Sequence, residues 1–285
     1  MKTFALRRLI TFGFLFSFLS QGLWGAELHP WTLQAWERYV RLTEARIAGE
    51  LNGGAKFLVT DLQSDGESRP VRSLIRNGQV YIRKLETNDE QGRKIAVKDG
   101  MIHHWIGVIL VPGTKLVTLV GWLQDYDRHE NYFKEVEKSK LVSRQGAQFN
   151  IFLRLRRKKI ITVYYNTYHT AVYRQHDAKR VSSHSFTTKI AELDDPGATT
   201  ERGKPSGDDS GFLWRLNSYW RFQEEGGGVV VECESISISR SIPAGLALRR
   251  RGLGGLGWLI HGYVESVPRE SLEDTLRSIR EGVGK

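Results

Sequence analysis

The chain of 285 residues contains a single cysteine, Cys233, so no disulfide can form within the molecule. This excludes the class of small secreted modules that are held together by several disulfides. Cys233 lies among valines in a strand-like run. That setting is typical of a small buried apolar residue rather than of a reactive thiol.

Motifs for metal binding and for nucleophilic catalysis are also missing. The histidines show no HExxH spacing, and His103 and His104 are adjacent, so they point to opposite faces of a strand. No GxSxG occurs. Gly252–Gly257 matches GxGxxG in form, but it follows three arginines instead of a buried strand, which disfavours a dinucleotide site. We predict neither a metal nor a cofactor.

A long apolar run occurs only at the N-terminus. Lys2, Arg7 and Arg8 precede the uncharged stretch Leu9–Trp24, and small residues follow at 25 and 26. This pattern predicts a signal peptide over residues 1–26 and export to the periplasm or cell envelope. A tryptophan stands where the cleavage site prefers a small residue, so an uncleaved membrane anchor is the alternative.

Basic residues outnumber acidic ones, with a formal net charge of +10. Removing the three basic residues of the leader leaves +7. An exported basic protein suggests anionic partners such as phospholipid headgroups, whereas nucleic acid is not expected in that compartment. The charge gathers at Arg154–Lys159 and at Arg249–Arg251. Each cluster is also explained by a solvated turn.

Hydrophobic periodicity predicts a mixed N-terminal half. Trp31–Leu51 has the spacing of an amphipathic helix that ends at glycines. Asn77-Gly78 is a strong hairpin signal. The strands expected around it and after it are Lys56–Asp61, Ser73–Arg76, Gln79–Leu85 and Met101–Val111. We expect two short helices between Thr114 and Phe133, with a break near Asp125.

The second half reads as an antiparallel meander of about six strands. These are Ser139–Arg144, Ala147–Arg157, Lys159–Tyr173, Val181–Leu193, Phe212–Glu224 and Val229–Ser239. The segment Asp194–Ser210 is rich in Gly, Pro and charge, which indicates a long loop. Two helical stretches follow, Gly257–Val264 and Arg269–Glu281, with Pro268 expected to interrupt them.

Three segments carry a resemblance to a known family: WLQDYDRHENYFKEVEKSKLV, RLNSYWRF and VECESISISRSIPAGL. Together with the element order, they resemble bacterial members of the START and polyketide-cyclase-like (SRPBCC, helix-grip) superfamily. The resemblance implies an α+β fold in which a curved antiparallel sheet of six to seven strands grips a C-terminal helix. It covers about Met101 to Glu281, within a predicted domain over residues 97–285, and residues 27–96 are predicted to form an N-terminal helix and hairpin extension.

The predicted ligand site follows from strand alternation. Large apolar side chains of Phe212–Glu224 share one parity, and so one face of the strand. If the sheet curves over the last helix, that face and its neighbours line a hydrophobic tunnel. The expected ligand-binding residues are Ile151, Leu153, Val163, Tyr165, Trp214, Leu216, Trp220 and Phe222. Polar groups that orient a ligand could come from Tyr165, Thr167, Ser185 or Thr187. A filled core without ligand is the alternative.

The sequence leaves the roles of two further groups of residues undecided. Glu232 and Glu234 share a parity with Arg240, and they either meet Arg240, Arg215 or a polar ligand head, or form a solvent-facing edge. The glycine-rich loop could gate the tunnel mouth beside a membrane. The expected membrane contacts are Arg249, Arg250, Arg251, Leu253 and Leu256.

Three functions fit these observations. The first is an exported binding or carrier protein for a lipid-like molecule, without catalysis. The second is a cyclase- or hydratase-type enzyme in the same cavity, with Tyr165, His169 or Arg215 moving protons. The third is a scaffold with a filled core that acts through its basic surface. A shared fold does not choose among them.

Overall fold

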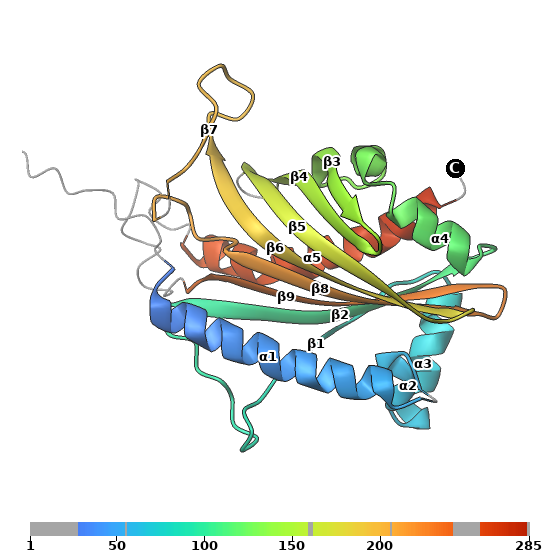
Figure 1. Cartoon of the computed structure of the whole chain (residues 1–285). Helices are drawn as coiled ribbons and strands as arrows, with labels where there is room; N and C mark the ends of the chain where they lie inside the picture. The colour runs from blue at the N-terminus through green and yellow to red at the C-terminus, as the bar shows by residue number, and fades with distance from the viewer. Residues whose placement is uncertain (1–27, 55, 159–161, 206, 242–256, 284–285) are drawn as a thin grey trace, which may run out of the picture.

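The computed structural model describes residues 28–54, 56–158, 162–205, 207–241 and 257–283, with backbone only for 65 and 257–264. One antiparallel sheet dominates it, in the order β1-β2-β9-β8-β6-β5-β4-β3, with β7 paired to β6 (Figure 1). Its strands are β1 Tyr81–Lys84, β2 Gly100–Pro112, β3 Val136–Gln145, β4 Gln148–Lys158, β5 Thr162–Asp177, β6 Arg180–Asp194, β7 Arg202–Gly203, β8 Arg215–Glu225 and β9 Gly228–Arg240.

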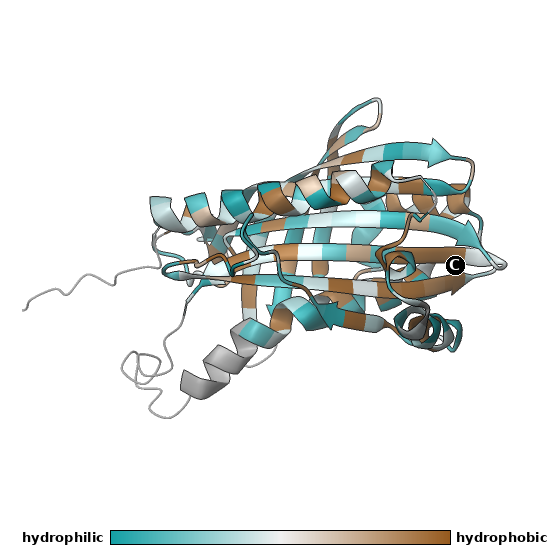
Figure 2. Ribbon diagram, turned by 90° about the horizontal axis from the view of Figure 1, so that it is seen from below, coloured by the Kyte–Doolittle hydropathy of each residue, from teal (hydrophilic) through white to brown (hydrophobic). Residues whose placement is uncertain are grey.

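Helices cover both faces of this sheet. The C-terminal helix α5 (Gly257–Gly282) lies on one face, which we call the inner face, and α1 (Pro30–Asn52) lies on the other, the outer face. Figure 2 shows the sheet edge-on between these two helices. The curved sheet around a C-terminal helix confirms the predicted helix-grip α+β class, with more strands than the six to seven expected.

Alternation in β9 explains how one strand serves both faces. Val231 and Cys233 pack against Leu276 of α5, whereas Ile236 and Ile238, of the other parity, pack beneath α1. β9 is buried along almost all of its length because both of its faces are covered. The pairing of β2 with β9 runs from Gly100↔Arg240 to Pro112↔Gly228, so it joins segments far apart in the sequence.

The N-terminal extension differs from the prediction. Two of the expected strands, Lys56–Asp61 and Ser73–Arg76, are replaced by helices α2 (Val59–Leu62) and α3 (Asp65–Arg76). A capping box begins α3, in which the Glu67 carboxylate accepts the Ser64 amide at 3.4 Å. Asn77-Gly78 ends α3 instead of turning a hairpin, and Gly78 has φ 79°. The end of a helix and the turn of a hairpin both place glycine in the left-handed region. The dipeptide Asn-Gly therefore fits either structure, and the hairpin prediction was wrong here.

Most other elements are confirmed. α1, β2, the six strands of the meander and the break between α4 (Leu116–Leu123) and the 3-10 helix η1 (Tyr126–Asn131) lie where the sequence placed them. The predicted interruption at Pro268 is wrong, since α5 continues through it. Among the described residues, no helix has the length and apolar character needed to cross a membrane.

Candidate functional site

A cavity lies between the inner face of the sheet and α5. Its larger compartment, about 200 Å³, extends under η1. A second compartment, about 120 Å³, reaches toward the N-terminal half of α5. The two share part of their lining: Arg157, Leu216, Ser218, Trp220 and Thr275. The sheet and the helix therefore leave a space between them that has two adjoining compartments.

Six of the eight predicted ligand-binding residues line this cavity. Ile151, Leu153 and Phe222 line the larger compartment and Tyr165 the smaller one. Leu216 and Trp220 line both, at the junction of the two compartments. The apolar parity of β4, β5 and β8 thus reaches the inner face as the alternation indicates.

Two predicted residues lie elsewhere. Val163 is buried in a neighbouring cluster with Leu155 and Tyr165, and lines neither compartment. Trp214 precedes the first residue of β8 and packs in the cluster beneath α1. Its indole donates to Asp209 at 3.3 Å. The parity count had extended the strand backward past its real start, so it placed Trp214 on the wrong side of the sheet.

Of the polar groups expected to orient a ligand, Ser185 and Tyr165 line the cavity. The Thr167 hydroxyl donates to the Leu153 carbonyl at 3.0 Å, and the Thr187 hydroxyl accepts the Leu216 amide at 3.1 Å. These two threonines therefore satisfy backbone groups of the sheet instead.

Hydroxyl groups that sequence reasoning missed form much of the polar lining. They come from Ser183, Ser218, Ser235 and Ser237 on the sheet and from Ser271, Thr275 and Ser278 on α5. The signal was present in SISIS of β9, where alternation turns the serines inward and the isoleucines outward.

Burial keeps the titratable groups deep in the larger compartment uncharged. It lowers the pKa of His169 to about 4 and raises the pKa of Tyr173 to about 12. The Tyr173 hydroxyl is 2.9 Å from that of Tyr126. Arg157 pairs with Glu135, which also accepts the Ser271 hydroxyl at 3.0 Å. The wall therefore combines neutral polar groups with the Arg157–Glu135 ion pair, and Lys134 and Asp274 also line the larger compartment.

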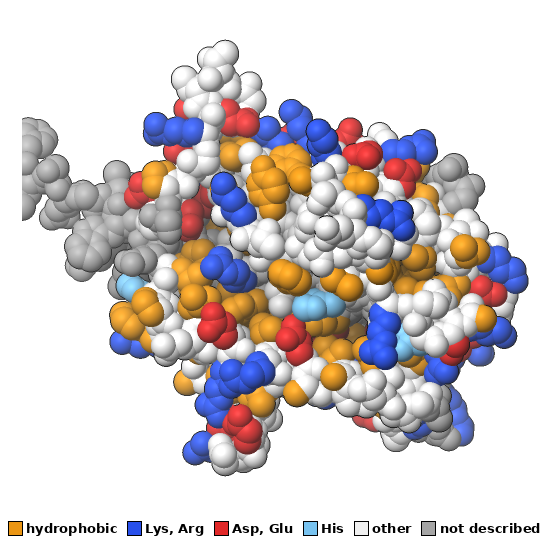
Figure 3. Space-filling model, in the orientation of Figure 1, with side chains coloured by type: hydrophobic (Ala, Val, Ile, Leu, Met, Phe, Trp, Pro, Cys, Tyr) orange, Lys and Arg blue, Asp and Glu red, His pale blue; other side chains and the backbone are white. Residues whose placement is uncertain are grey.

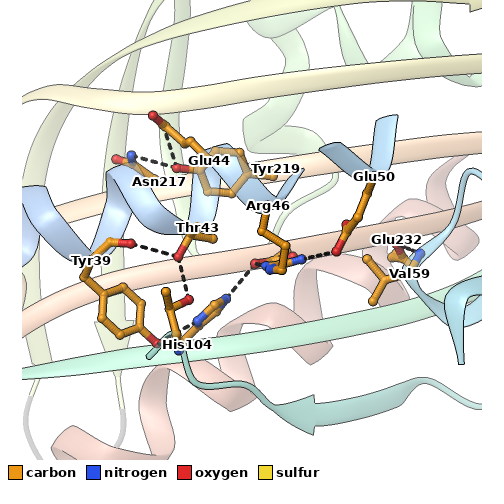
Figure 4. Close-up of polar contacts among 12 residues, drawn as sticks. Tyr39, Thr43, Glu44, Arg46, Glu50, Val59, His104, Asn217, Tyr219 and Glu232 are labelled. Carbon is orange, nitrogen blue, oxygen red and sulfur yellow. Dashed lines mark hydrogen bonds and ion pairs between the residues drawn. The ribbon is translucent and has the colours of Figure 1, made fainter. Parts of the chain in front are cut away.

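The other titratable cluster lies on the outer face, beneath α1 (Figure 4). Glu234 is 2 % exposed, and its Oε1 accepts from His104 Nε2 at 2.7 Å and pairs with Arg46. Burial alone would raise the pKa of Glu234, but the hydrogen bond from His104 and the charge of Arg46 hold it below its ordinary value. The Tyr39 hydroxyl accepts the Thr87 amide at 2.8 Å and lies within hydrogen-bond distance of His104 Nδ1, at 2.9 Å.

Glu232, 1 % exposed, belongs to the same layer. It accepts the Val59 amide at 2.8 Å and the Thr60 amide at 3.3 Å, and its nearest cation is Arg221 at 4.0 Å. Burial raises the pKa of Glu232 to about 7. The expectation of a solvent-facing edge is wrong for both glutamates, and their cations come from Arg46 and Arg221 rather than Arg240 or Arg215. This layer joins the N-terminal helices to the sheet.

The structure does not bring the three proposed proton-transfer groups together. Tyr165 and His169 line different compartments, and Arg215 lies on the outer face in a groove beside Trp36 and Glu44. His103 and His104 do point to opposite faces, toward Ser239 and Glu234. Within the described ranges, no group of three or more His, Cys, Asp or Glu side chains could hold a metal ion. The predicted membrane contacts, Arg249–Arg251, Leu253 and Leu256, fall outside those ranges.

No protein-family model and no curated protein matches the chain. Solved structures similar to it include a STAR-related lipid transfer protein from Xanthomonas axonopodis, 15% identical, covering 72% of this chain and 93% of that chain with a TM-score of 0.43. Human STARD10 is 10% identical, with 80% and 83% covered and a TM-score of 0.43. The Zhui aromatase/cyclase from Streptomyces sp. R1128 is 9% identical, with 64% and 94% covered and a TM-score of 0.42. Likeness at this level transfers neither a ligand nor an activity.

Proposed function

We propose that the protein binds a hydrophobic small molecule in the cavity between the inner face of the sheet and α5. The observation that carries this proposal is the space between the sheet and α5, which is lined by Trp220, Phe222, aliphatic side chains and several hydroxyl groups. Ligand sites are mostly apolar concavities with a few polar groups that fix orientation. A core that served only stability would be filled to the density of an organic crystal.

Export and carriage are part of the proposal. The leader-like sequence of residues 1–26 favours a protein that works in the periplasm or cell envelope. There a cavity that removes an apolar molecule from water would let the protein hold or carry it between membranes. Arg249–Arg251, with Leu253 and Leu256 beside them, are the residues we propose to meet an anionic membrane surface.

The test is native mass spectrometry of the protein purified from its own envelope fraction, followed by organic extraction. We expect an additional mass that is released as a lipid-like compound. The variant Ser218→Phe should lose that mass, because residue 218 lines both compartments and a phenyl ring would fill their junction. Val172→Phe is the matched control, since Val172 is an exposed residue of β5. A bare polypeptide that stays bare after incubation with envelope lipids would contradict the proposal.

A cyclase-type enzyme is the second candidate, and one observation favours it. The Thr167 hydroxyl proton goes to the Leu153 carbonyl, so Thr167 accepts from His169 Nε2–H at 2.9 Å. The lone pair then sits on Nδ1 of an uncharged imidazole in the cavity wall, where it can accept a hydrogen bond or a proton from a bound substrate. With the extracted compound as substrate, His169→Asn should abolish turnover and leave binding intact. Unchanged wild-type substrate after incubation would exclude this candidate.

A further inference from the structure

Three serines form a continuous row across the floor of the cavity. Ser185 of β6 is the register partner of Ser218 of β8, and Ser218 is the register partner of Ser235 of β9. Residues directly opposite in adjacent strands share a face, and neighbouring strands lie about 4.8 Å apart. The row passes from the larger compartment, which Ser185 lines, to the smaller one, which Ser235 lines. Trp220 and Leu216 flank Ser218 along its own strand.

These hydroxyls are unpaired. Ser185, Ser218 and Ser235 have no hydrogen-bond partner among the residues that the structure describes, and the same holds for Ser237, which is 4 % exposed and lines the smaller compartment. Ser278 on α5, 6 % exposed, is unpaired in the described chain as well and lines the larger compartment.

Serines elsewhere in the sheet are paired. The Ser182 hydroxyl meets His176 at 2.8 Å, and the Ser239 hydroxyl meets His103 at 2.9 Å. Ser183, which also lines the larger compartment, forms a hydrogen bond with Tyr173. None of these open hydroxyls is among the fully buried polar atoms that lack a partner in the described chain, so they face the space of the cavity, and a ligand that fills this space and displaces water must supply their hydrogen bonds.

We propose that this serine row selects the ligand, and that the ligand is an apolar molecule bearing carbonyl or hydroxyl oxygens along its length rather than a hydrocarbon chain with one polar end. The inference rests on the proposed function and names its ligand class. Oxygens spaced along the molecule could pair with Ser185, Ser218 and Ser235 together. A plain acyl chain over the same floor would leave these hydroxyls covered and unpaired, and that arrangement is disfavoured by desolvation.

The test compares two probes on the full chain: 1,8-dihydroxyanthraquinone, which carries oxygens along its rings, and palmitic acid, which carries them at one end. Binding is measured by isothermal titration calorimetry for wild type and for Ser218→Ala/Ser235→Ala. Each lost hydroxyl should weaken the anthraquinone by about fivefold to tenfold, with palmitic acid unchanged. Ser182→Ala is the matched control, because it removes a hydroxyl from β6 on the opposite face.

The outcomes separate the two proposals. Selective weakening of the anthraquinone in the double variant supports the serine row. An anthraquinone affinity that is the same in the double variant as in wild type, or palmitic acid binding more tightly than the anthraquinone to wild type, overturns the row and leaves the cavity proposal standing. Binding of neither probe, together with a bare polypeptide mass, overturns both. Circular dichroism melting of each variant excludes unfolding as the cause.

Discussion

Trp220 and Trp214 are separated by five residues along the chain and serve opposite sides of the sheet. Trp220 lines both compartments of the cavity, whereas Trp214 is 5 % exposed beneath α1. The same substitution at the two positions therefore separates binding from stability. An indole that walls a pocket contributes to affinity, and one that fills a core contributes to the free energy of unfolding.

We expect Trp220→Ala to weaken binding of the anthraquinone probe by about tenfold or more, with a modest loss of stability. Trp214→Ala should lower the free energy of unfolding by about 3 kcal/mol or more and leave affinity unchanged in the protein that stays folded. Calorimetric titration and urea unfolding of both variants measure the two effects. A loss of affinity at Trp214 as large as that at Trp220 would refute the assignment of the two faces.

Glu232 predicts a pH dependence of stability. Its pKa in the folded protein is about 7, above the ordinary value of 4.5, because burial disfavours its charge. The folded state therefore binds the proton more tightly, and this contribution is complete below about pH 4.5 and is lost as pH rises through 7. The difference between the ordinary pKa of Glu232 and its pKa in the folded protein corresponds to about 3 kcal/mol in the free energy of unfolding.

The change Glu232→Gln should remove this contribution to the pH dependence of stability. The amide oxygen can still accept the Val59 amide, and no charge forms beside Cys233 and Glu234 at high pH. His103, His129 and His169, whose pKa values burial lowers to about 4, oppose the trend as pH falls, so the informative quantity is the variant minus wild type. Urea unfolding at pH 5 and pH 8 should show the variant gaining relative stability at pH 8. A constant difference would show that Arg221 keeps Glu232 charged throughout.

At the level of elements, the contact between α5 and β2 sets the depth of the cavity. A Cβ at Gly107 would come within 2.5 Å of a Leu276 methyl group and 3.1 Å of Leu272. Glycine at this position lets the helix lie close to the strand at one end of the sheet. The cavity opens farther along, over β8, β6 and β5, where serines and aromatics replace such close packing.

Gly107→Ala should therefore lower the free energy of unfolding by about 1–3 kcal/mol, since it overpacks the contact with α5. Gly121→Ala is the matched control. Nothing lies within 4 Å of a Cβ at that position in α4, and the change should be neutral or stabilising by up to about 1 kcal/mol. Urea unfolding of both variants decides the point. Equal behaviour of the two variants would mean that α5 can shift to accept the methyl group.

The elements also show how far the sequence leads. Alternation in β8 and β9 predicts the inner face correctly within each strand, because the period of two is a property of the strand itself. It fails at Trp214, where the strand has not begun. Alternation also cannot reveal that Glu234 is buried. The helix that covers Glu234 and supplies its partner Arg46 lies 188 residues earlier in the chain, so no pattern within β9 reports it. The serine row depends on the register of three strands, which their separate patterns do not fix.

The whole molecule carries a formal charge of +10, and Figure 3 shows Lys and Arg side chains spread over the outer face. Lys138 and Lys140 of β3 lie opposite Arg154 and Phe152, and Lys189 of β6 lies opposite Tyr168. Net charge alone would draw such a protein to any anionic surface. The scaffold hypothesis requires only this attraction of the net positive charge to an anionic surface. The carrier hypothesis requires contact near the proposed tunnel mouth, at Arg249–Arg251.

Two triple variants of equal charge distinguish these hypotheses. Arg249, Arg250 and Arg251 changed to Ser, and Lys138, Lys140 and Lys189 changed to Ser, each remove three positive charges from the protein. Each basic residue near an anionic bilayer contributes about 1 kcal/mol, so the arginine variant should lose on the order of 100-fold in partitioning to phosphatidylglycerol vesicles. The lysine variant should lose much less, and neither should bind phosphatidylcholine. Vesicle sedimentation at two salt concentrations measures this, since screening weakens exposed charges. Equal losses in the two variants would favour a scaffold that acts through its net charge.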